Sequence, residues 1–375
     1  MKFDYLIVGA GYAGSILAER IATQLDKKVL IVDKRDHIAG NAYDYYNNDG
    51  VLVHKYGPHI FHTSSKKVWD YLSEFTEWNT YNHYVQAIVE GKRVPVPFNL
   101  NSIYALFPQK YAEKLETKLI ERYGYGIKIP ILKMKEVEDE ELRFLAEYIY
   151  KNVFYGYTVK QWNLKPEELD YNVTSRVPVY ISRDDRYFQD TYQALPKNGY
   201  TEMFKRIISH PNIRILLKTD YREAVEYIKF DKLIYTGPLD YYFDNMFGEL
   251  PYRSLNFDIK TFDTEQYQEV GQVNYPNNYD YTRITEFKHL SQQKHLKSSV
   301  AFEYPQAYIP GVNDPYYPIP RPDNNELFAK YKAEADKLDG SVYFVGRLAD
   351  YKYYNMDQIA GVALQLFEKK IAKSR

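Results

Sequence analysis

Near the start of the chain, the apolar residues form two short continuous runs with a helical stretch between them. The first run, Phe3–Val8, leads into the glycine-rich turn Gly9–Gly14, and the second run, Val29–Val32, ends on Asp33. Short apolar runs that stop at glycine or a polar residue are typical of buried strands in a parallel sheet. The pattern therefore predicts a strand, an α-helix over Ser15–Leu25 and a second strand.

Helical spacing predominates from about residue 65 to 160. One helix is expected between an N-cap at Asn101 and a stop at Gly124, with apolar residues at Leu115, Leu119 and Tyr123. The charge run 135–141 is expected to be a solvated surface or a helix start. A further helix, expected to end at Gly156, has one apolar face made by Leu142, Leu145, Ile149 and Val153. A mainly helical inserted domain follows from these patterns.

Alternation with a period of two residues begins after about residue 175. It predicts an antiparallel sheet made by Asn256–Thr261, Glu269–Tyr275, Tyr281–Phe287 and Ser299–Tyr304. Two other segments, Lys232–Gly237 and Val342–Gly346, are apolar runs stopped by glycine, so we expect them to return to the parallel sheet. Proline is frequent over residues 305–322, and its restricted φ can hold side chains over a site without a hydrogen-bond ladder.

The turn with Gly9, Gly11 and Gly14 lies between a predicted strand and a predicted helix. Glycines in this arrangement let the backbone approach a pyrophosphate and direct the amides of the helix N-terminus toward it. Asp33 follows the second strand, where a carboxylate can accept hydrogen bonds from a ribose. The sequence predicts a bound dinucleotide, and a tight turn without a ligand is the alternative.

A second helix N-terminus is predicted near Met356, after the strand that stops at Gly346. Its positive end could face the pyrimidine edge of a flavin, where charge collects on reduction. We therefore predict FAD rather than NAD, in an α/β protein with a Rossmann-like FAD-binding parallel sheet domain, an inserted helical bundle and an antiparallel β-sheet domain. The FAD-binding domain is predicted over residues 1–75, 201–240 and 326–375, the helical domain over 76–170, and the antiparallel domain over 171–200 and 241–325.

Composition limits the partners of the protein. Lys and Arg number 49 and Asp and Glu number 50, so the net charge of −1 gives no field that recruits nucleic acid or an anionic membrane. The absence of cysteine excludes a thiol nucleophile and disulfides, and it fits a reducing cytosol. No leader precedes the first strand and no apolar run approaches the ~20 residues of a membrane span. A soluble cytoplasmic protein is expected.

Eight separate segments match one family in order. The chain closely resembles bacterial UDP-galactopyranose mutases from residue 3 to about 366, through His37–Asp44, Tyr56–Thr63, Tyr157–Trp162, Ser175–Pro178, Arg186–Gln193, Thr282–Glu286, Tyr316–Pro320 and Gly346–Leu348. The resemblance implies an FAD flavoprotein that interconverts UDP-galactopyranose and UDP-galactofuranose and supplies galactofuranose for cell-surface polysaccharide. It also implies a homodimer, and we expect a reductant such as NAD(P)H.

The resemblance also assigns the substrate site. A sugar nucleotide carries a pyrophosphate of charge about −2, and its burial requires cations or several hydroxyl donors. Arg176 is assigned to a mobile loop over the substrate and Arg283 to the diphosphate beside the flavin, where each could otherwise be an ordinary surface or paired arginine. Hydroxyl contacts to phosphate are assigned to Tyr187, Tyr317 and Tyr353, and packing against uridine to Tyr157 and Trp162.

His59 and His62 are placed near the flavin by the resemblance. Metal ligation by the two histidines is less favoured, because no third ligand accompanies them at a familiar spacing. The other alternative is a histidine that is buried and hydrogen-bonded in the core without a functional role. Arg253 is implied to contact FAD. The remaining residues assigned to the cofactor are Gly40, Asn41, Gly346, Arg347, Asn355, Met356 and Asp357. Two positions depart from the family pattern: Asp33 replaces the usual Glu, and Asn355 replaces Asp, which puts in doubt any role that needs a carboxylate there.

The implied mechanism uses reduced FAD, whose N5 atom attacks the anomeric carbon, expels UDP and holds the sugar as a covalent adduct while the ring opens and closes. Arg176 and Arg283 would stabilise the departing UDP, and His62 is the third candidate catalytic residue. Neither a preference for galactose over N-acetylgalactosamine nor the state of the Arg176 loop follows from sequence. An FAD-dependent amine or polyol oxidase and a non-catalytic UDP-sugar sensor remain alternatives.

Overall fold

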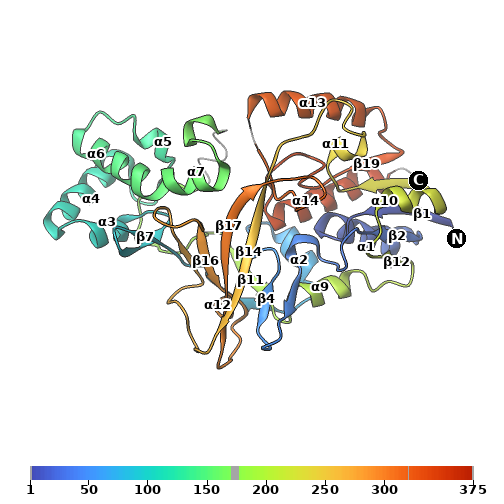
Figure 1. Ribbon diagram of the computed structural model, residues 1–375, viewed down its shortest axis with the longest axis horizontal. Helices are drawn as coiled ribbons and strands as arrows, with labels where there is room; N and C mark the ends of the chain where they lie inside the picture. Colours follow the sequence, from blue (N-terminus) through green and yellow to red (C-terminus); the bar gives the residue numbers. More distant parts are fainter. Residues whose placement is uncertain (1, 170–176, 320, 374–375) are drawn as a thin grey trace.

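The computed structural model describes residues 2–169, 177–319 and 321–373. A parallel sheet lies at one end of the molecule, a large twisted sheet in the middle and a group of helices at the other end, with both termini beside the parallel sheet (Figure 1). None of the helices within these described ranges is long and apolar enough to cross a membrane.

The parallel sheet has β1 (Lys2–Val8) at its centre. Its neighbours are β2 (Val29–Val32) and β13 (Lys229–Tyr235), and the edges are β12 (Ile213–Leu216) and β19 (Val342–Phe344). All four pairings are parallel, so the predicted return of the two later segments is confirmed. β12 was not predicted. The carboxyl ends of these strands share one edge, where ligands of such sheets bind.

Helices cover both faces of this sheet because each has an apolar side to bury. α1 (Tyr12–Leu25) and α14 (Met356–Leu366) pack against each other and share one core with α9 (Tyr200–Ile207). α10 (Tyr221–Tyr227) contributes Ala224 to the core of the opposite face. The predicted helix start near Met356 is confirmed, and α1 begins earlier than expected, at Tyr12.

A seven-stranded sheet forms the middle of the molecule. Its order is β18 (Tyr317–Pro318), β14 (Tyr252–Phe262), β17 (Ser298–Ala307), β16 (Arg283–Glu286), β15 (Gln272–Asn274), β7 (Val85–Val89) and β8 (Lys92–Val96). The four predicted runs are all strands of this sheet, and only the β15–β7 pairing is parallel. β18 shows that the proline-rich connection also contributes a short ladder.

The prediction of helix from residue 65 was wrong for β6 (Trp78–Thr80), β7 and β8. β7 and β8 form a hairpin whose two-residue turn, Glu90 and Gly91, has positive φ at both positions. Such a turn suits the right-handed twist of paired strands, and the alternation of buried and half-buried residues in β7 completes the strand pattern. Tertiary pairing therefore outweighs the helical spacing on either side.

Beyond this hairpin the chain is helical, with α3 (Leu100–Leu106), α4 (Gln109–Tyr123), α5 (Ile131–Met134), α6 (Glu140–Ile149), the π-helical turn η2 (Tyr150–Tyr155) and α7 (Gly156–Trp162). Two predictions fail here. Asn99 caps α3, whereas Asn101 lies inside that helix. The helix does not stop at Gly156, which has helical φ and ψ and whose missing side chain lets Pro276 approach: a Cβ would lie 2.5 Å from the Pro276 carbonyl oxygen. The stop at Gly124 is confirmed.

Short elements connect these layers. A hairpin turn around Gly50 joins β3 (Asp44–Tyr46) to β4 (Leu52–His54). β11 (Tyr192–Pro196) pairs with β5 (Phe61–Thr63) on one side and β6 on the other. The remaining elements are η1 (Gly40–Ala42), α2 (Lys66–Ser73), β9 (Lys128–Ile129), η3 (Pro166–Glu168), β10 (Val179–Tyr180), α11 (Leu239–Tyr242), α12 (Phe287–Ser291), α13 (Pro322–Asp336) and η4 (Phe367–Ile371).

Candidate active site

The glycine turn after β1 is a close contact between backbone segments. Gly9 has a φ of 103°, and a Cβ there would lie 2.1 Å from the Thr236 hydroxyl oxygen. A Cβ on Gly14 would lie 1.9 Å from the Gly9 carbonyl oxygen, and one on Gly40 would lie 3.0 Å from the Cα of Gly11. Side chains are thus excluded from the turn by backbone packing, which leaves its amides open to a ligand.

A cavity of about 710 Å³ lies in front of this turn. Gly9, Gly11 and Gly14 form part of its wall, and Gly40, Asn41 and His59 form another part. The N-cap of α1 is Gly11, which offers no side chain to the first helical amides. An anionic ligand in the cavity can accept those hydrogen bonds and meets the positive end of the helix dipole.

Asp33 lies on the cavity wall at the end of β2. Its carboxylate accepts hydrogen bonds from the backbone N–H of Ala10 at 2.8 Å and of Arg35 at 2.9 Å. A carboxylate has about four acceptor sites, so these bonds fix its position and leave capacity for a ribose hydroxyl. Through these bonds the side chain of Asp33, which is shorter than that of a Glu, connects the end of β2 to the glycine turn.

The distant C-terminal segment completes the cavity. Gly346, with a φ of 123°, lines it together with Arg347, Asn355 and Met356. Asn355 is the N-cap of α14, and its backbone N–H donates to Oε1 of Gln358 at 2.9 Å. Two helix N-termini therefore face one cavity. Asp357 does not line it: its Oδ1 atom is buried, with no hydrogen-bond partner in the described part of the chain.

Sequence reasoning missed the side chains that enclose the far part of the cavity. They come from residues 219–221, 235–241 and 308–315. The guanidinium of Arg35 donates to Asp314 at 3.0 Å and to Asn41 at 2.9 Å, and it lies 4.3 Å from the ring centroid of Tyr56. This ion pair holds the proline-rich loop over the cavity. The proline content of 305–322 indicated such a loop, but nothing local indicated its partner.

Two buried imidazoles support the wall opposite the glycine turn. His59 Nδ1 lies 2.8 Å from the carbonyl oxygen of Gly57, and His54 Nδ1 accepts from the His59 backbone N–H at 3.1 Å. Burial lowers the pKa of His54 to about 4 and that of His59 to about 3. Both rings are neutral at physiological pH. With Nδ1 of His59 donating to Gly57, its Nε2 is an acceptor.

Arg253 is a buried cation on β14. Its Nε donates to the carbonyl oxygen of Gln161 at 3.0 Å, and burial alone lowers its pKa, with no carboxylate opposing that shift among the residues described. It does not line the cavity of the glycine turn. A buried guanidinium paired only with a carbonyl is a natural partner for an anionic or carbonyl group of a ligand.

Arg283 is a second arginine of the site, half-buried and paired with a buried carboxylate. Its Nε and one terminal nitrogen each lie 2.7 Å from Oε2 of Glu303, whose side chain is 2% exposed. Burial opposes the charge of Arg283, but the Glu303 carboxylate outweighs burial and raises the arginine pKa. The guanidinium also influences the pKa of Tyr157 and Tyr317, so hydroxyl groups surround it. Its remaining N–H groups can bind a diphosphate.

Aromatic side chains extend this cluster toward the cavity. The rings of Tyr317 and Tyr353 stack at 4.9 Å, and Trp162, which is 8% exposed, lies 5.9 Å from Tyr317. The Arg347 guanidinium lies 5.6 Å and 5.1 Å from the two tyrosine ring centroids. Because Arg347 also lines the cofactor cavity, it joins that cavity to the aromatic cluster.

His62 and Tyr187 belong to a neighbouring group. His62 Nδ1 lies 2.8 Å from Oδ2 of Asp190, and its ring stacks on Phe188 at 3.7 Å. Tyr187 packs edge-on against Phe188, and His83 lies beside both residues. Burial lowers the pKa of His83 to about 3, with Arg283 and His62 as further causes. Sequence reasoning gave no role to His83, Asp190 or Glu303, although Asp190 lies within the matching segment Arg186–Gln193.

The remaining predicted residue, Arg176, lies outside the described residues, so its position is not part of this site. No group of three His, Cys, Asp or Glu side chains suited to a metal ion occurs in residues 2–169, 177–319 and 321–373. The site therefore combines a dinucleotide-sized cavity, a half-buried arginine among hydroxyl groups, stacked aromatic rings and neutral imidazoles. This set can bind a cofactor and a diphosphate-bearing ligand side by side.

The chain is similar to several known proteins in sequence and in fold. A family model described as UDP-galactopyranose mutase matches residues 152–353, and a Rossmann-like NAD(P)-binding model matches residues 7–75. The chain is 38% identical to a probable UDP-galactopyranose mutase of Klebsiella pneumoniae, covering 96% of this chain and 93% of that protein. It is 33% identical to a dTDP-fucopyranose mutase of Escherichia coli, with 99% of each covered. A solved structure of reduced UDP-galactopyranose mutase has a TM-score of 0.77 at 16% identity, covering 98% and 93%.

Proposed function

This chain belongs to the UDP-galactopyranose mutase family, and from that premise we propose that it interconverts UDP-galactopyranose and UDP-galactofuranose. The observation that carries the proposal is the Arg283–Glu303 pair. The buried Glu303 fixes the half-buried guanidinium near the hydroxyls of Tyr157 and Tyr317. A cation held in this way suits a diphosphate that leaves during the reaction and has to return.

We propose FAD as the cofactor because the glycine turn, Asp33 and the second helix N-terminus fit the two ends of a flavin dinucleotide. Bound and reduced, FAD would supply the N5 nucleophile that bonds covalently to the anomeric carbon while the sugar ring opens. Arg253 would face the flavin, and His59 would offer it a neutral acceptor.

The chain's own residues would hold the substrate. Trp162 and Tyr157 would pack against the uracil ring, while Tyr187, Tyr317 and Tyr353 would donate to phosphate. Arg283 would neutralise the diphosphate as UDP departs, and Arg176, outside the described residues, would add a second cation. The proposed setting is a homodimer in the cytoplasm, reduced by a donor such as NAD(P)H, with galactofuranose going to cell-surface polysaccharide.

The test uses the purified holoprotein reduced with dithionite. Incubation with UDP-galactofuranose should release UDP-galactopyranose on chromatography, with no net change in flavin oxidation. Parallel reactions with UDP-N-acetylgalactosamine and dTDP-fucopyranose define the sugar and base preference, because the Escherichia coli relative is named for the latter. Peroxide formation with substrate-driven flavin bleaching would instead identify an amine or polyol oxidase. Tight UDP binding without turnover of any sugar nucleotide would identify a sensor.

A further inference from the structure

His62 and Asp190 form a half-buried pair whose carboxylate the proposed function does not use. The distance from Nδ1 to Oδ2 is 2.8 Å, and the His62 side chain is 12% exposed. One face of the imidazole is covered by Phe188 at a centroid distance of 3.7 Å and an interplanar angle of 13°. Stacking and hydrogen bonding together leave the ring a single orientation.

Asp190 is itself held at several points. Its Oδ1 atom accepts from the Ser64 hydroxyl at 3.1 Å, and its backbone oxygen accepts from Nε2 of Gln193 at 3.0 Å. Gln193 is also the residue on β11 that pairs with His62 on β5. The strand register therefore fixes the histidine and the carboxylate relative to each other.

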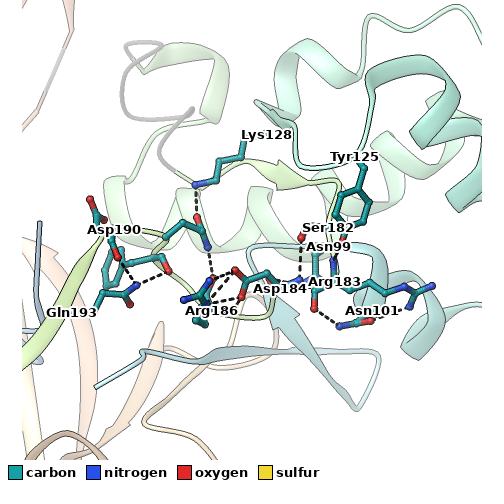
Figure 2. A network of polar contacts seen from close by, with 12 residues as sticks. Asn99, Asn101, Tyr125, Lys128, Ser182, Arg183, Asp184, Arg186, Asp190 and Gln193 are labelled. Carbon is teal, nitrogen blue, oxygen red and sulfur yellow. Dashed lines mark hydrogen bonds and ion pairs between the residues drawn. The ribbon is translucent and has the colours of Figure 1, made fainter. Parts of the chain in front are cut away.

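The segment that carries Asp190 is anchored to the helical part of the molecule (Figure 2). Asn99 donates to Oδ1 of Asp185 at 2.7 Å, and Arg186 forms an ion pair with Asp184. Lys128 donates to Gln189, which in turn donates to the carbonyl oxygen of Arg186. Figure 2 shows two groups of contacts along this segment, one around Asn99, Asn101, Asp184 and Arg186 and the other joining Asp190 to Gln193. Such a network gives Asp190 little freedom to follow His62 if the ring moves.

The chemistry of the pair follows from its donors and acceptors. An ionised carboxylate only accepts hydrogen bonds, so Nδ1 of His62 has to carry the proton. In the neutral ring the lone pair is then on Nε2, which has no hydrogen-bond partner among the described residues. The carboxylate also stabilises the imidazolium that forms when Nε2 takes up a proton. The pair is arranged for reversible proton transfer at Nε2.

We propose that Asp190 is a positioning residue for His62, which acts as the proton carrier of the sugar ring exchange. This inference rests on the proposed function. In that exchange the bond from the anomeric carbon to the ring oxygen O5 breaks and a bond to O4 forms, so O5 gains one proton and O4 loses one. As the ring opens, the imidazolium gives the proton on Nε2 to O5, and as the new ring closes the neutral imidazole takes the proton of O4 at Nε2, so the imidazolium is restored.

The first test measures the tautomer directly and needs no turnover. In the ¹⁵N-histidine-labelled holoprotein, with the His62 signals assigned through His62→Gln, the proton should be on Nδ1 at neutral pH. In Asp190→Asn the neutral amide can donate as well as accept, so this preference for a proton on Nδ1 should weaken. His83, Lys128 and Arg283 are the other titratable or charged groups near the pair. A wild-type ring without a proton on Nδ1 would overturn the proposal.

The second test is kinetic. Asp190→Asn should lower kcat by about 10- to 100-fold, the range for a carboxylate that orients an imidazole, with KM changed less than about threefold. Its kcat-against-pH profile should differ in shape from that of the wild type, and Asp190→Glu, which keeps a carboxylate, should recover part of the rate. Asp339→Asn, which breaks an exposed ion pair with Lys370, is the matched control and should leave kcat unchanged.

An unchanged kcat and tautomer in Asp190→Asn would overturn the inference while leaving the mutase proposal intact. Absence of turnover in the wild type with every sugar nucleotide would overturn both the proposed function and the proton-carrier role. Should Asp190→Asn fail to fold, the wild-type tautomer and the Asp190→Glu pH profile decide the matter, because both are read in folded protein.

Discussion

The cofactor cavity and the substrate cluster beside it are constructed in opposite ways. In the cavity wall, Gly14 and Gly40 pack against backbone atoms and Gly9 packs against the Thr236 side chain, with no space for even a methyl group. The substrate cluster around Arg283 and Trp162 consists of side chains from separate segments, each oriented by another side chain. The cavity depends on the absence of side chains at these glycines, whereas the substrate cluster depends on side chains that other side chains hold in place. Substitutions in the cavity should therefore change the flavin content, and substitutions in the substrate cluster should change the kinetics.

The largest effect is expected from Gly14→Ala. Its Cβ would lie 1.9 Å from the Gly9 carbonyl oxygen, a backbone atom that cannot move without displacing β1 or α1. We expect loss of bound cofactor, measured as flavin absorbance per chain after purification. Gly361→Ala is the control, because its Cβ would lie 3.6 Å from Val68, an ordinary contact. Equal flavin content in the two variants would show that backbone packing does not shape the cavity.

Arg283→Lys should leave the cofactor in place and damage only the substrate cluster. Lysine cannot make the paired contacts of a guanidinium to Glu303 and a diphosphate together. We expect kcat/KM of the reduced enzyme to fall about 10²- to 10³-fold, as when one charge-stabilising donor is removed. Flavin content should match the wild type, and loss of flavin in this variant would mean that the two regions are not independent.

A smaller effect, on stability, is expected where the two regions meet at His54 and His59. The folded pKa of His54, about 4, lies below its ordinary value of 6.5, so the unfolded chain takes up the proton first as pH falls. Stability should therefore decrease from about pH 6.5 downward, by up to about 1.4 kcal/mol per pH unit for this histidine. His54→Asn, whose amide oxygen can replace Nδ1, should reduce that slope in urea unfolding between pH 6.5 and 5. An unchanged slope would contradict the buried neutral imidazole.

The smallest effect is expected from Asn355→Asp, which places a carboxylate at the N-cap of α14. Both residues are preferred N-caps, so the free energy of unfolding should change by less than about 0.5 kcal/mol. Flavin content should be unchanged as well. A large gain in kcat would show instead that the site requires a carboxylate at this position, and a steady-state comparison at matched flavin content decides between these outcomes.

What could be predicted from sequence follows the same division. The parallel sheet and the glycine turn were predictable because the constraint is local: Gly14 and Asp33 lie within one strand-helix-strand unit. The β7–β8 hairpin was missed because its partners are distant strands. Glu303 and Asp190 were missed because the side chains that they orient are far away in the sequence: Asp190 lies in the segment Arg186–Gln193 but 128 positions from His62. Sequence identifies the side chains that touch a ligand more readily than those that orient them.

The ion pair between Arg35 and Asp314 has a consequence for biosynthesis. The two residues are 279 positions apart, and Gly346 follows still later in the chain. During translation the glycine turn is among the first structures made, whereas the loop that encloses its ligand is among the last. The nascent chain thus lacks a complete cofactor site until synthesis has passed residue 346. The protein can therefore bind its cofactor in the complete site only late in synthesis or after it.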